Sequence, residues 1–250
     1  MRKIAVFVEG QTELIVTREF ILKTYQYQDV RVGCYNLLDG TTPNPAPYPF
    51  GPKGAPIYYQ INNVGGDVNV LETILEQEAY LFSEGKQFNK IVGLRDMFSE
   101  DYVKTVKNRT IDPKLNQQFI KGVRLTINEM AIQSDKIAFQ FAIMETEAWF
   151  LGMEAVITKL NETLNAESIQ TKIGYSLAEI DPETTVFHPA RTLNDIFSLF
   201  NQKYKKRQEQ VDKIMGQVQL GDIKTLYQSS KCPTFTQYCD ALELPIRTVT

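Results

Sequence analysis

Four acidic side chains follow three apolar runs of this 250-residue chain, at the positions where buried strands are expected to end. They are Glu9 after residues 4–8, Asp96 after residues 90–94, and Glu145 and Glu147 after residues 137–144. Because functional groups of a parallel sheet gather at the carboxyl ends of its strands, these carboxylates are expected to meet there. Each one alone is more simply interpreted as an acid that favours a helix start.

Carboxylate oxygens are the ligands that Mg²⁺ and Mn²⁺ prefer, so the group predicts a divalent-metal site. Such an ion can neutralise a phosphate ester and activate water for its cleavage. Glu145 and Glu147 share a face if the chain is extended, but they diverge by about 200° in a helix. If a helix begins at residue 145, only one of the two is expected to join Glu9 and Asp96 as a metal ligand.

The elements that must position these residues alternate between strands and helices. Strands are predicted over residues 4–8, 30–38, 57–61, 90–94 and 137–144, and helices over 12–22, 68–82, 114–131 and from 145. Asp67 is the expected N-cap of the second helix. This order predicts an α/β fold with a Rossmann-like parallel sheet over residues 1–160. Residues 161–250 are helical in pattern and predict a helical extension, with a strand no stronger than 185–187.

The segment 41–56 contains six of the eleven prolines, a density that argues against any regular element. It is interpreted either as a loop that docks a partner or as an insertion. Cys34, Cys232 and Cys239 lack paired spacing and are expected to be reduced, buried thiols. The chain contains no apolar stretch of about 20 residues, so no membrane span and a cytoplasmic location are expected.

With 27 Lys and Arg against 30 Asp and Glu, the net charge of −3 excludes a globally basic nucleic-acid coat. Contact with nucleic acid would need a local patch or a bound metal. The run 203–207 is the densest basic segment, expected on a helix whose inner stripe includes Tyr204. A solvated face is its simpler interpretation, and phosphate contact through Lys205, Lys206 and Arg207 is the alternative. Arg191 is a candidate for phosphate contact or for a salt bridge, whereas His188, the only histidine, is interpreted as structural.

Residues 8–13, Val-Glu-Gly-Gln-Thr-Glu, resemble the first motif of Toprim domains, the metal-dependent fold of topoisomerases, primases and overcoming-lysogenization-defect nucleases. The chain is more closely similar to a bacterial Toprim-like family catalogued as a domain of unknown function. That similarity runs through the turn 65–67, Asp96, the segment 145–151 and most of the remaining chain. It implies that Glu9 is a general base or metal ligand and that Asp96 is a metal ligand, and Glu13 is expected to orient that shell.

The resemblance further implies a bacterial defence or mobile-element context and an ABC-type ATPase partner. Such a partner is compatible with the absence of a Gly-rich nucleotide-binding fingerprint. The leading hypothesis is therefore an Mg²⁺- or Mn²⁺-dependent nuclease that cleaves DNA or RNA.

The sequence departs from the Toprim pattern after the strand that ends at Asp96. Toprim domains carry Asp-x-Asp there, whereas Phe98 stands at the second position; Met153 likewise stands where the related family carries an acid. Glu100 or Asp101 could supply the missing carboxylate, or Glu145 and Glu147 could. The departure favours a second hypothesis, a catalytically silent module that binds an ATPase or nucleic acid. A third is a metal-dependent phosphotransferase or phosphatase that acts on small nucleotides.

Overall fold

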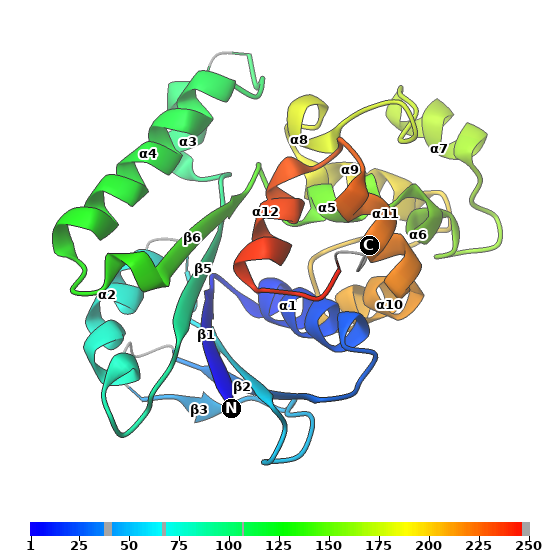
Figure 1. The fold of residues 1–250 in the computed structure, drawn as a ribbon. Coiled ribbons are helices and arrows are strands. Elements are labelled where there is room, and N and C mark those ends of the chain that lie inside the picture. Colours follow the sequence, from blue (N-terminus) through cyan, green and yellow to red (C-terminus); the bar gives the residue numbers. More distant parts are fainter. Residues whose placement is uncertain (38–41, 67–68, 107, 247–250) are drawn as a thin grey trace. The chain divides into compact units, whose positions relative to one another are not determined.

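The computed structural model describes residues 1–37, 42–66, 69–106 and 108–246 (Figure 1). It confirms the predicted α/β class, with a six-stranded, mostly parallel sheet in the N-terminal part and helices in the C-terminal part. The strands are β1 (Arg2–Val8), β2 (Val30–Asn36), β3 (Asn44–Pro45), β4 (Ile57–Asn63), β5 (Lys90–Asp96) and β6 (Ile137–Ala142). The helices are α1 (Gln11–Thr24), α2 (Asn69–Phe82), α3 (Glu100–Thr105), α4 (Pro113–Met130), α5 (Glu147–Gly152), α6 (Glu154–Thr158), α7 (Ala166–Ile173), α8 (Pro182–Thr185), α9 (Pro189–Ser198), α10 (Gln208–Gln217), α11 (Leu220–Gln228) and α12 (Pro233–Ala241), with a 3₁₀ turn η1 (Ser134–Lys136) before β6.

The chain forms two compact units. Unit one comprises Met1–Arg95, Gln117–Phe141 and the described residues from Asp240 onward. Unit two comprises Asp96–Asn116 and Ala142–Cys239. The boundary expected at residue 160 between a sheet domain and a helical extension stays a prediction.

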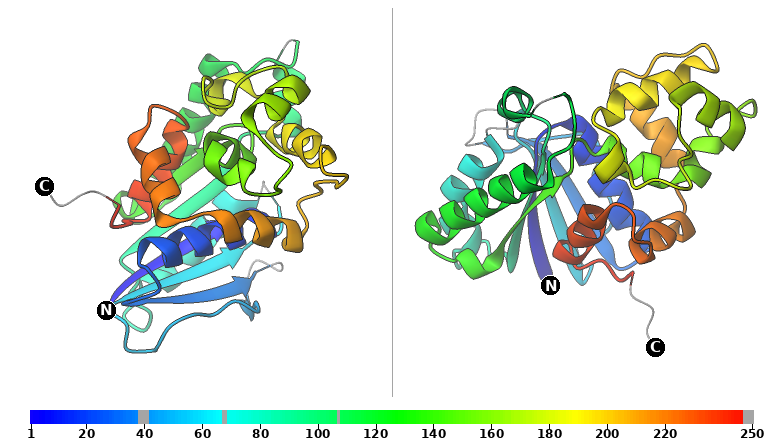
Figure 2. Two further views of the ribbon diagram at one scale, coloured as in Figure 1. Left: turned by 90° about the vertical axis from the view of Figure 1, so that its right-hand side faces the viewer. Right: turned by 90° about the horizontal axis from the view of Figure 1, so that it is seen from above.

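The apolar strand β1 lies in the middle of the sheet. The strand order is β3-β2-β4-β1-β5-β6, and β1 runs parallel to both β4 and β5. Val8, the last residue of β1, is in register with Asn63 of β4 and Leu94 of β5. Within unit one, α1 covers one face of the sheet, and α2 with residues 117–130 of α4 covers the other (Figures 1 and 2). This arrangement buries both faces of β1, which explains its unbroken apolar sequence.

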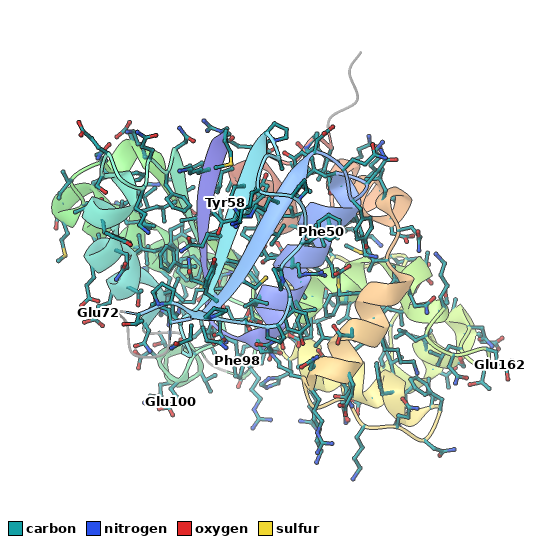
Figure 3. All side chains as sticks on the ribbon, turned by 90° about the horizontal axis from the view of Figure 1, so that it is seen from below. Phe50, Tyr58, Glu72, Phe98, Glu100 and Glu162 are labelled. Carbon is teal, nitrogen blue, oxygen red and sulfur yellow. The ribbon has the colours of Figure 1, made fainter. Side chains whose placement is uncertain are left out.

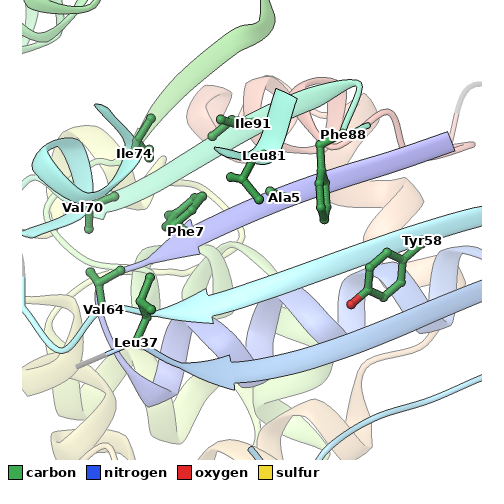
Figure 4. Close-up of a cluster of buried hydrophobic side chains, with 10 residues drawn as sticks. All are labelled: Ala5, Phe7, Leu37, Tyr58, Val64, Val70, Ile74, Leu81, Phe88 and Ile91. Atoms are coloured by element: carbon green, nitrogen blue, oxygen red, sulfur yellow. The ribbon is translucent and has the colours of Figure 1, made fainter. Parts of the chain in front are cut away.

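The core between the sheet and α2 takes every second residue of β1. Ala5 and Phe7 point to the same face because side chains alternate along a strand. They belong to a cluster whose members are all at most 8% exposed (Figure 4): Ala5, Phe7, Leu37, Tyr58, Val64, Val70, Ile74, Leu81, Phe88 and Ile91. The burial of these side chains holds β1 in the middle of the sheet, and Glu9 follows directly beyond its end.

The proline-rich segment covers the edge of the sheet, and the expectation that it lacks regular structure is wrong for its described residues. β3 pairs antiparallel with β2, and Val32 and Phe50 form a further bridge. Proline cannot donate to a strand ladder, but it is tolerated on an edge strand, where one side needs no partner. The segment therefore protects the edge of β2 against pairing with another chain.

Unit two is built around Trp149 of α5. Its indole is fully buried, stacks on Tyr238 at 5.5 Å between ring centroids and meets Phe235 edge-on at 5.7 Å. Met153, Val156 and Leu160, which follow Trp149 at helical spacing, are buried as well. The helix is interrupted between α5 and α6 rather than continuous.

Some local expectations differ from the structure or fall outside it. The weak strand expected at 185–187 is not formed, because residues 182–185 make the short helix α8. The N-cap assigned to Asp67 and the start of the second helix at Val68 lie outside the described residues. Cys34, Cys232 and Cys239 are buried thiols, as predicted. Within the described ranges, no helix combines the length and apolar character that crossing a membrane requires.

Gly51 anchors the proline-rich segment to β2 and gives a test of this edge cover. Its φ is +81°, and an added Cβ would lie 2.2 Å from the carbonyl oxygen of Val30. We expect Gly51→Ala to lower the free energy of unfolding by about 1–3 kcal/mol, through backbone strain and the clash. Urea denaturation measures the change.

Gly54 is the matched control, because an added Cβ there meets nothing within 4 Å. Gly54→Ala is expected to change stability by no more than about 0.5 kcal/mol. Equal stabilities of the two variants would show that the segment is not held against β2.

Candidate metal centre

Three of the predicted carboxylates converge in unit two. Asp96 ends β5, and Glu145 and Glu147 follow β6; each offers an oxygen, and these three oxygens all lie within 4.8 Å of one another. Their side chains are 8%, 13% and 0% exposed respectively. Burying a charged group costs free energy unless it is paired or binds an ion. The three carboxylates therefore need hydrogen-bond donors and positive charge close to them.

The chain after β6 brings both glutamates to this point. The amide of Phe98 donates to the carbonyl of Met144 at 2.8 Å, which continues the pairing of the two strands beyond their ends. Met144 has a φ of +64°, so the chain turns there, and α5 begins only at Glu147. Glu145 therefore precedes the helix.

This start of α5 corrects the expectation that only one of the two glutamates could bind an ion. That expectation assumed a helix from residue 145, in which the side chains would diverge. Because the turn at Met144 and Thr146 separates Glu145 from the helix, both carboxylates reach the same point.

Each carboxylate is held through one oxygen by a neutral donor. The amide of Thr146 donates to Asp96 Oδ1 at 3.0 Å, and the hydroxyl of Tyr204 donates to Glu147 Oε1 at 2.8 Å. The amide of Ala190, in the first turn of α9, donates to Glu145 Oε2 at 2.9 Å. A helix N-terminus carries partial positive charge, so α9 also attracts the carboxylate of Glu145. The donors fix the orientation of all three carboxylates.

The second oxygen of each carboxylate faces the ammonium of Lys206. Lys206 Nζ lies 3.0 Å from Glu145 Oε1, 3.0 Å from Glu147 Oε2 and 3.7 Å from Asp96 Oδ2. Three carboxylates and one ammonium leave a formal charge of −2 at this centre. The carboxylates therefore carry more negative charge than the one ammonium neutralises.

Lys206 reaches the carboxylates because the basic run 203–207 is not helical, which corrects the prediction for this segment. α9 ends at Ser198, and α10 begins at Gln208. The intervening chain is pinned by hydrogen bonds, among them that from the Tyr204 amide to Asn194 Oδ1 at 3.0 Å. Tyr204 is 5% exposed, and Lys206 is partly buried. The remaining basic residues of the run point outward and are exposed: Lys203, Lys205 and Arg207.

Phe98 occupies a ring cluster in place of the second acid of the Toprim pattern. Its ring centroid lies 4.9 Å from that of His188 and 6.0 Å from that of Phe187. His188 is also the N-cap of α9, so its interpretation as structural agrees with its contacts. Burial lowers the pKa of His188.

Glu100 does not supply the missing carboxylate. Its side chain is 89% exposed, pairs with Lys104 at 3.2 Å and projects from α3 (Figure 3). Asp101, also in the first turn of α3, is exposed as well. Of the two substitutes considered, the pair Glu145 and Glu147 is the one that joins Asp96.

Glu9 and Glu13 lie in unit one, at the carboxyl end of β1. The carbonyl of Glu9 accepts a hydrogen bond from the amide of Gly66 at 2.9 Å. The carboxylate of Glu13 folds back toward Gly10, since a Cβ there would lie 3.0 Å from Glu13 Oε2. The chain leaves β1 through α1 and β4 through α2, on opposite faces, and such a divergence is where parallel sheets bind ligands. The participation of Glu9 and Glu13 in the metal centre stays a prediction.

The exposed basic residues of unit two form the candidate phosphate contacts. Arg191, in the first turn of α9, is exposed, as are Lys205 and Arg207. Arg207 makes only a long ion pair with Glu209, at 4.0 Å, and both side chains are well exposed. Exposed pairs of this kind contribute little to stability.

Sequence reasoning missed that the side chains of Tyr204 and Lys206 contact the carboxylates. Alternation of buried and exposed residues in 203–207 is typical of an extended chain. The expectation of a helix over this run concealed that alternation. Comparisons of the chain with protein-family models, curated proteins and solved structures found no match.

A further buried carboxylate, that of Glu183 in α8, also holds α5 in place. Glu183 of α8 accepts hydrogen bonds from Trp149 Nε1 at 3.0 Å and from the amide of Thr234 at 3.1 Å, and the hydroxyl of Thr234 donates to it as well. Burial raises the pKa of Glu183 to about 7, although these hydrogen bonds oppose the shift. Asp181 raises it further through charge repulsion.

Because the folded protein holds the Glu183 proton more tightly than the unfolded chain does, its stabilising effect is complete below pH 4.5 and is lost as pH rises through 7. We expect the deprotonation of Glu183 to lower the free energy of unfolding by about 3 kcal/mol as pH rises from 4.5 through 7. Urea denaturation between pH 4.5 and 8, followed by the fluorescence of the single tryptophan, measures it.

Glu183→Gln cannot titrate and should show a smaller loss of stability over the same interval. The exposed Glu179→Gln is the control and should behave as the wild type. Parallel pH profiles for Glu183→Gln and the wild type would contradict the assignment.

Proposed function

We propose that this chain is a divalent-metal-dependent phosphodiester hydrolase, a Toprim-like nuclease, whose ion is held by Asp96, Glu145 and Glu147. The observation that carries the proposal is the convergence of three oriented carboxylate oxygens on one point. Oxygen-only donors suit Mg²⁺ or Mn²⁺. The three carboxylates together carry a formal charge of −3, which also favours a divalent ion.

When bound, Mg²⁺ or Mn²⁺ supplies Lewis-acid chemistry that neutralises charge on a phosphate ester. Asp96, Glu145 and Glu147 hold the ion, and Thr146, Ala190 and Tyr204 orient their oxygens in advance. Such preorganisation lowers the cost of reaching the reactive arrangement. Glu9 is proposed to act as general base or additional ligand and Glu13 to orient it, as the resemblance of residues 8–13 to the first Toprim motif suggests.

The proposed substrate is the phosphodiester backbone of DNA or RNA, contacted by Arg191, Lys205 and Arg207. Phosphate contacts supply most sequence-independent affinity for nucleic acid. A net charge of −3 gives weak unassisted binding, so we propose that a partner, of the ABC-type ATPase class, delivers the substrate.

The position of Lys206 favours one alternative, a module without catalysis that binds a partner ATPase or nucleic acid. In that case its ammonium would neutralise the carboxylates permanently and fix the turn before α10. The ring cluster of Phe98, which replaces an acid of the Toprim pattern, points the same way. Metal binding separates the two functions.

Glu147→Gln is expected to weaken Mn²⁺ binding by about tenfold or more, because it removes a charged ligand. The free Mn²⁺ signal in electron paramagnetic resonance measures binding directly. The matched control is Glu162→Gln, an exposed acid of unit two (Figure 3). Equal Mn²⁺ affinities in both variants would rule out this metal centre, provided that tryptophan fluorescence shows Glu147→Gln to be folded.

Asp96→Asn is expected to lower Mg²⁺-dependent nicking of plasmid DNA by about 100-fold or more, since loss of metal-assisted stabilisation is worth several kcal/mol. Glu9→Gln, assayed beside it, tests the role proposed for the first motif. Wild-type cleavage in both variants would assign the activity to a contaminant. Loss in Asp96→Asn alone would exclude Glu9 from the reaction.

A further inference from the structure

The cation site proposed above is already filled by a side chain of the same chain. Lys206 Nζ faces one oxygen from each of Asp96, Glu145 and Glu147, at 3.0–3.7 Å. These distances are typical of ammonium-to-carboxylate pairs. Lys206 is thus a resident cation of the cluster.

A metal ion would need the oxygens that Lys206 faces. The opposite oxygen of each carboxylate is oriented by the amide of Thr146, the amide of Ala190 or the hydroxyl of Tyr204. The oxygens on the Lys206 side all lie within 3.7 Å of one point, the ammonium nitrogen. Mg²⁺ requires ligand distances near 2.1 Å, so an ion held by all three would stand where the ammonium is, and two cations there would repel each other strongly.

The chain around Lys206 allows the ammonium to leave without unfolding the unit. The Lys206 side chain is 34% exposed, so it is not fully enclosed by the surrounding residues. Lys206 lies in the connection between α9 and α10, with a φ of +53°, a conformation that a lysine adopts at a cost. Tyr204, two residues earlier, is held by hydrogen bonds of its own amide and hydroxyl. The side chain of Lys206 can therefore move while Tyr204 stays in place.

From this geometry we infer that Lys206 is a tethered cation that competes with the divalent metal for Asp96, Glu145 and Glu147, so that metal binding expels its ammonium to the surface. The inference rests on the proposed metal-dependent function. The released ammonium joins Lys205 and Arg207, which are exposed on the same connection. Metal occupancy then adds one positive charge to the surface proposed to contact phosphate.

The first test compares Mn²⁺ affinities of the wild type, Lys206→Met and the control Lys203→Met by electron paramagnetic resonance. Lys206→Met is expected to bind Mn²⁺ about tenfold tighter or more, because no ammonium must be displaced and the competent state is fully populated. Lys203→Met is expected to match the wild type, since Lys203 is exposed.

The second test uses the wild-type protein and needs no variant to fold. An amine-reactive label, quantified residue by residue by mass spectrometry, is expected to modify Lys206 slowly without metal and several-fold faster in saturating Mn²⁺. Lys205 provides the internal control and should react equally in both conditions.

The outcomes separate this inference from the function on which it rests. Equal Mn²⁺ affinities in the wild type and Lys206→Met, or weaker binding by Lys206→Met, would overturn the competition while leaving the metal site intact. Labelling of Lys206 that does not change while Mn²⁺ is bound would do the same. Absence of Mn²⁺ binding in both proteins would overturn the metal centre itself, and the competition with it.

Discussion

The burial of three carboxylates around one ammonium is the constraint on which unit two depends. Moving an isolated charged group from water into the protein interior costs several kcal/mol of free energy. Removing one charged side chain of the cluster would therefore leave the charges of the others uncompensated. The cluster therefore requires the end of β5, the start of α5, the start of α9 and the turn before α10 to meet at one point. The need to compensate the buried carboxylate charges therefore fixes the positions of four separate chain segments.

α5 connects this polar centre to the aromatic core of unit two. Its first residue, Glu147, belongs to the carboxylate cluster, and Trp149, two residues on, is bound by Glu183 and Thr234. Trp149 also stacks on Tyr238. Because a short helix has little stability of its own, these anchors at both sides hold the orientation of Glu147.

The charge of the whole chain is a poor guide to the chemistry of this centre. A net charge of −3 suggests repulsion of phosphate, yet a bound divalent ion reverses the local sign. The ammonium of Lys206 already neutralises part of the negative charge. The charge at this centre therefore depends on which cation the carboxylates hold, rather than on the number of acidic residues in the chain.

The sequence by itself determined five of the six strands, the α/β class and the placement of Asp96, Glu145 and Glu147 at the ends of strands, because apolar runs and the residues that end them are local patterns. Only the tertiary structure decided that α5 begins at Glu147 and that the basic run is extended. Those outcomes depend on Thr146 binding Asp96, 50 residues away, and on Tyr204 binding Glu147, 57 residues away. Local spacing carries no record of such long-range hydrogen bonds, so Lys206 was predicted on a solvated helix although it lies among the carboxylates.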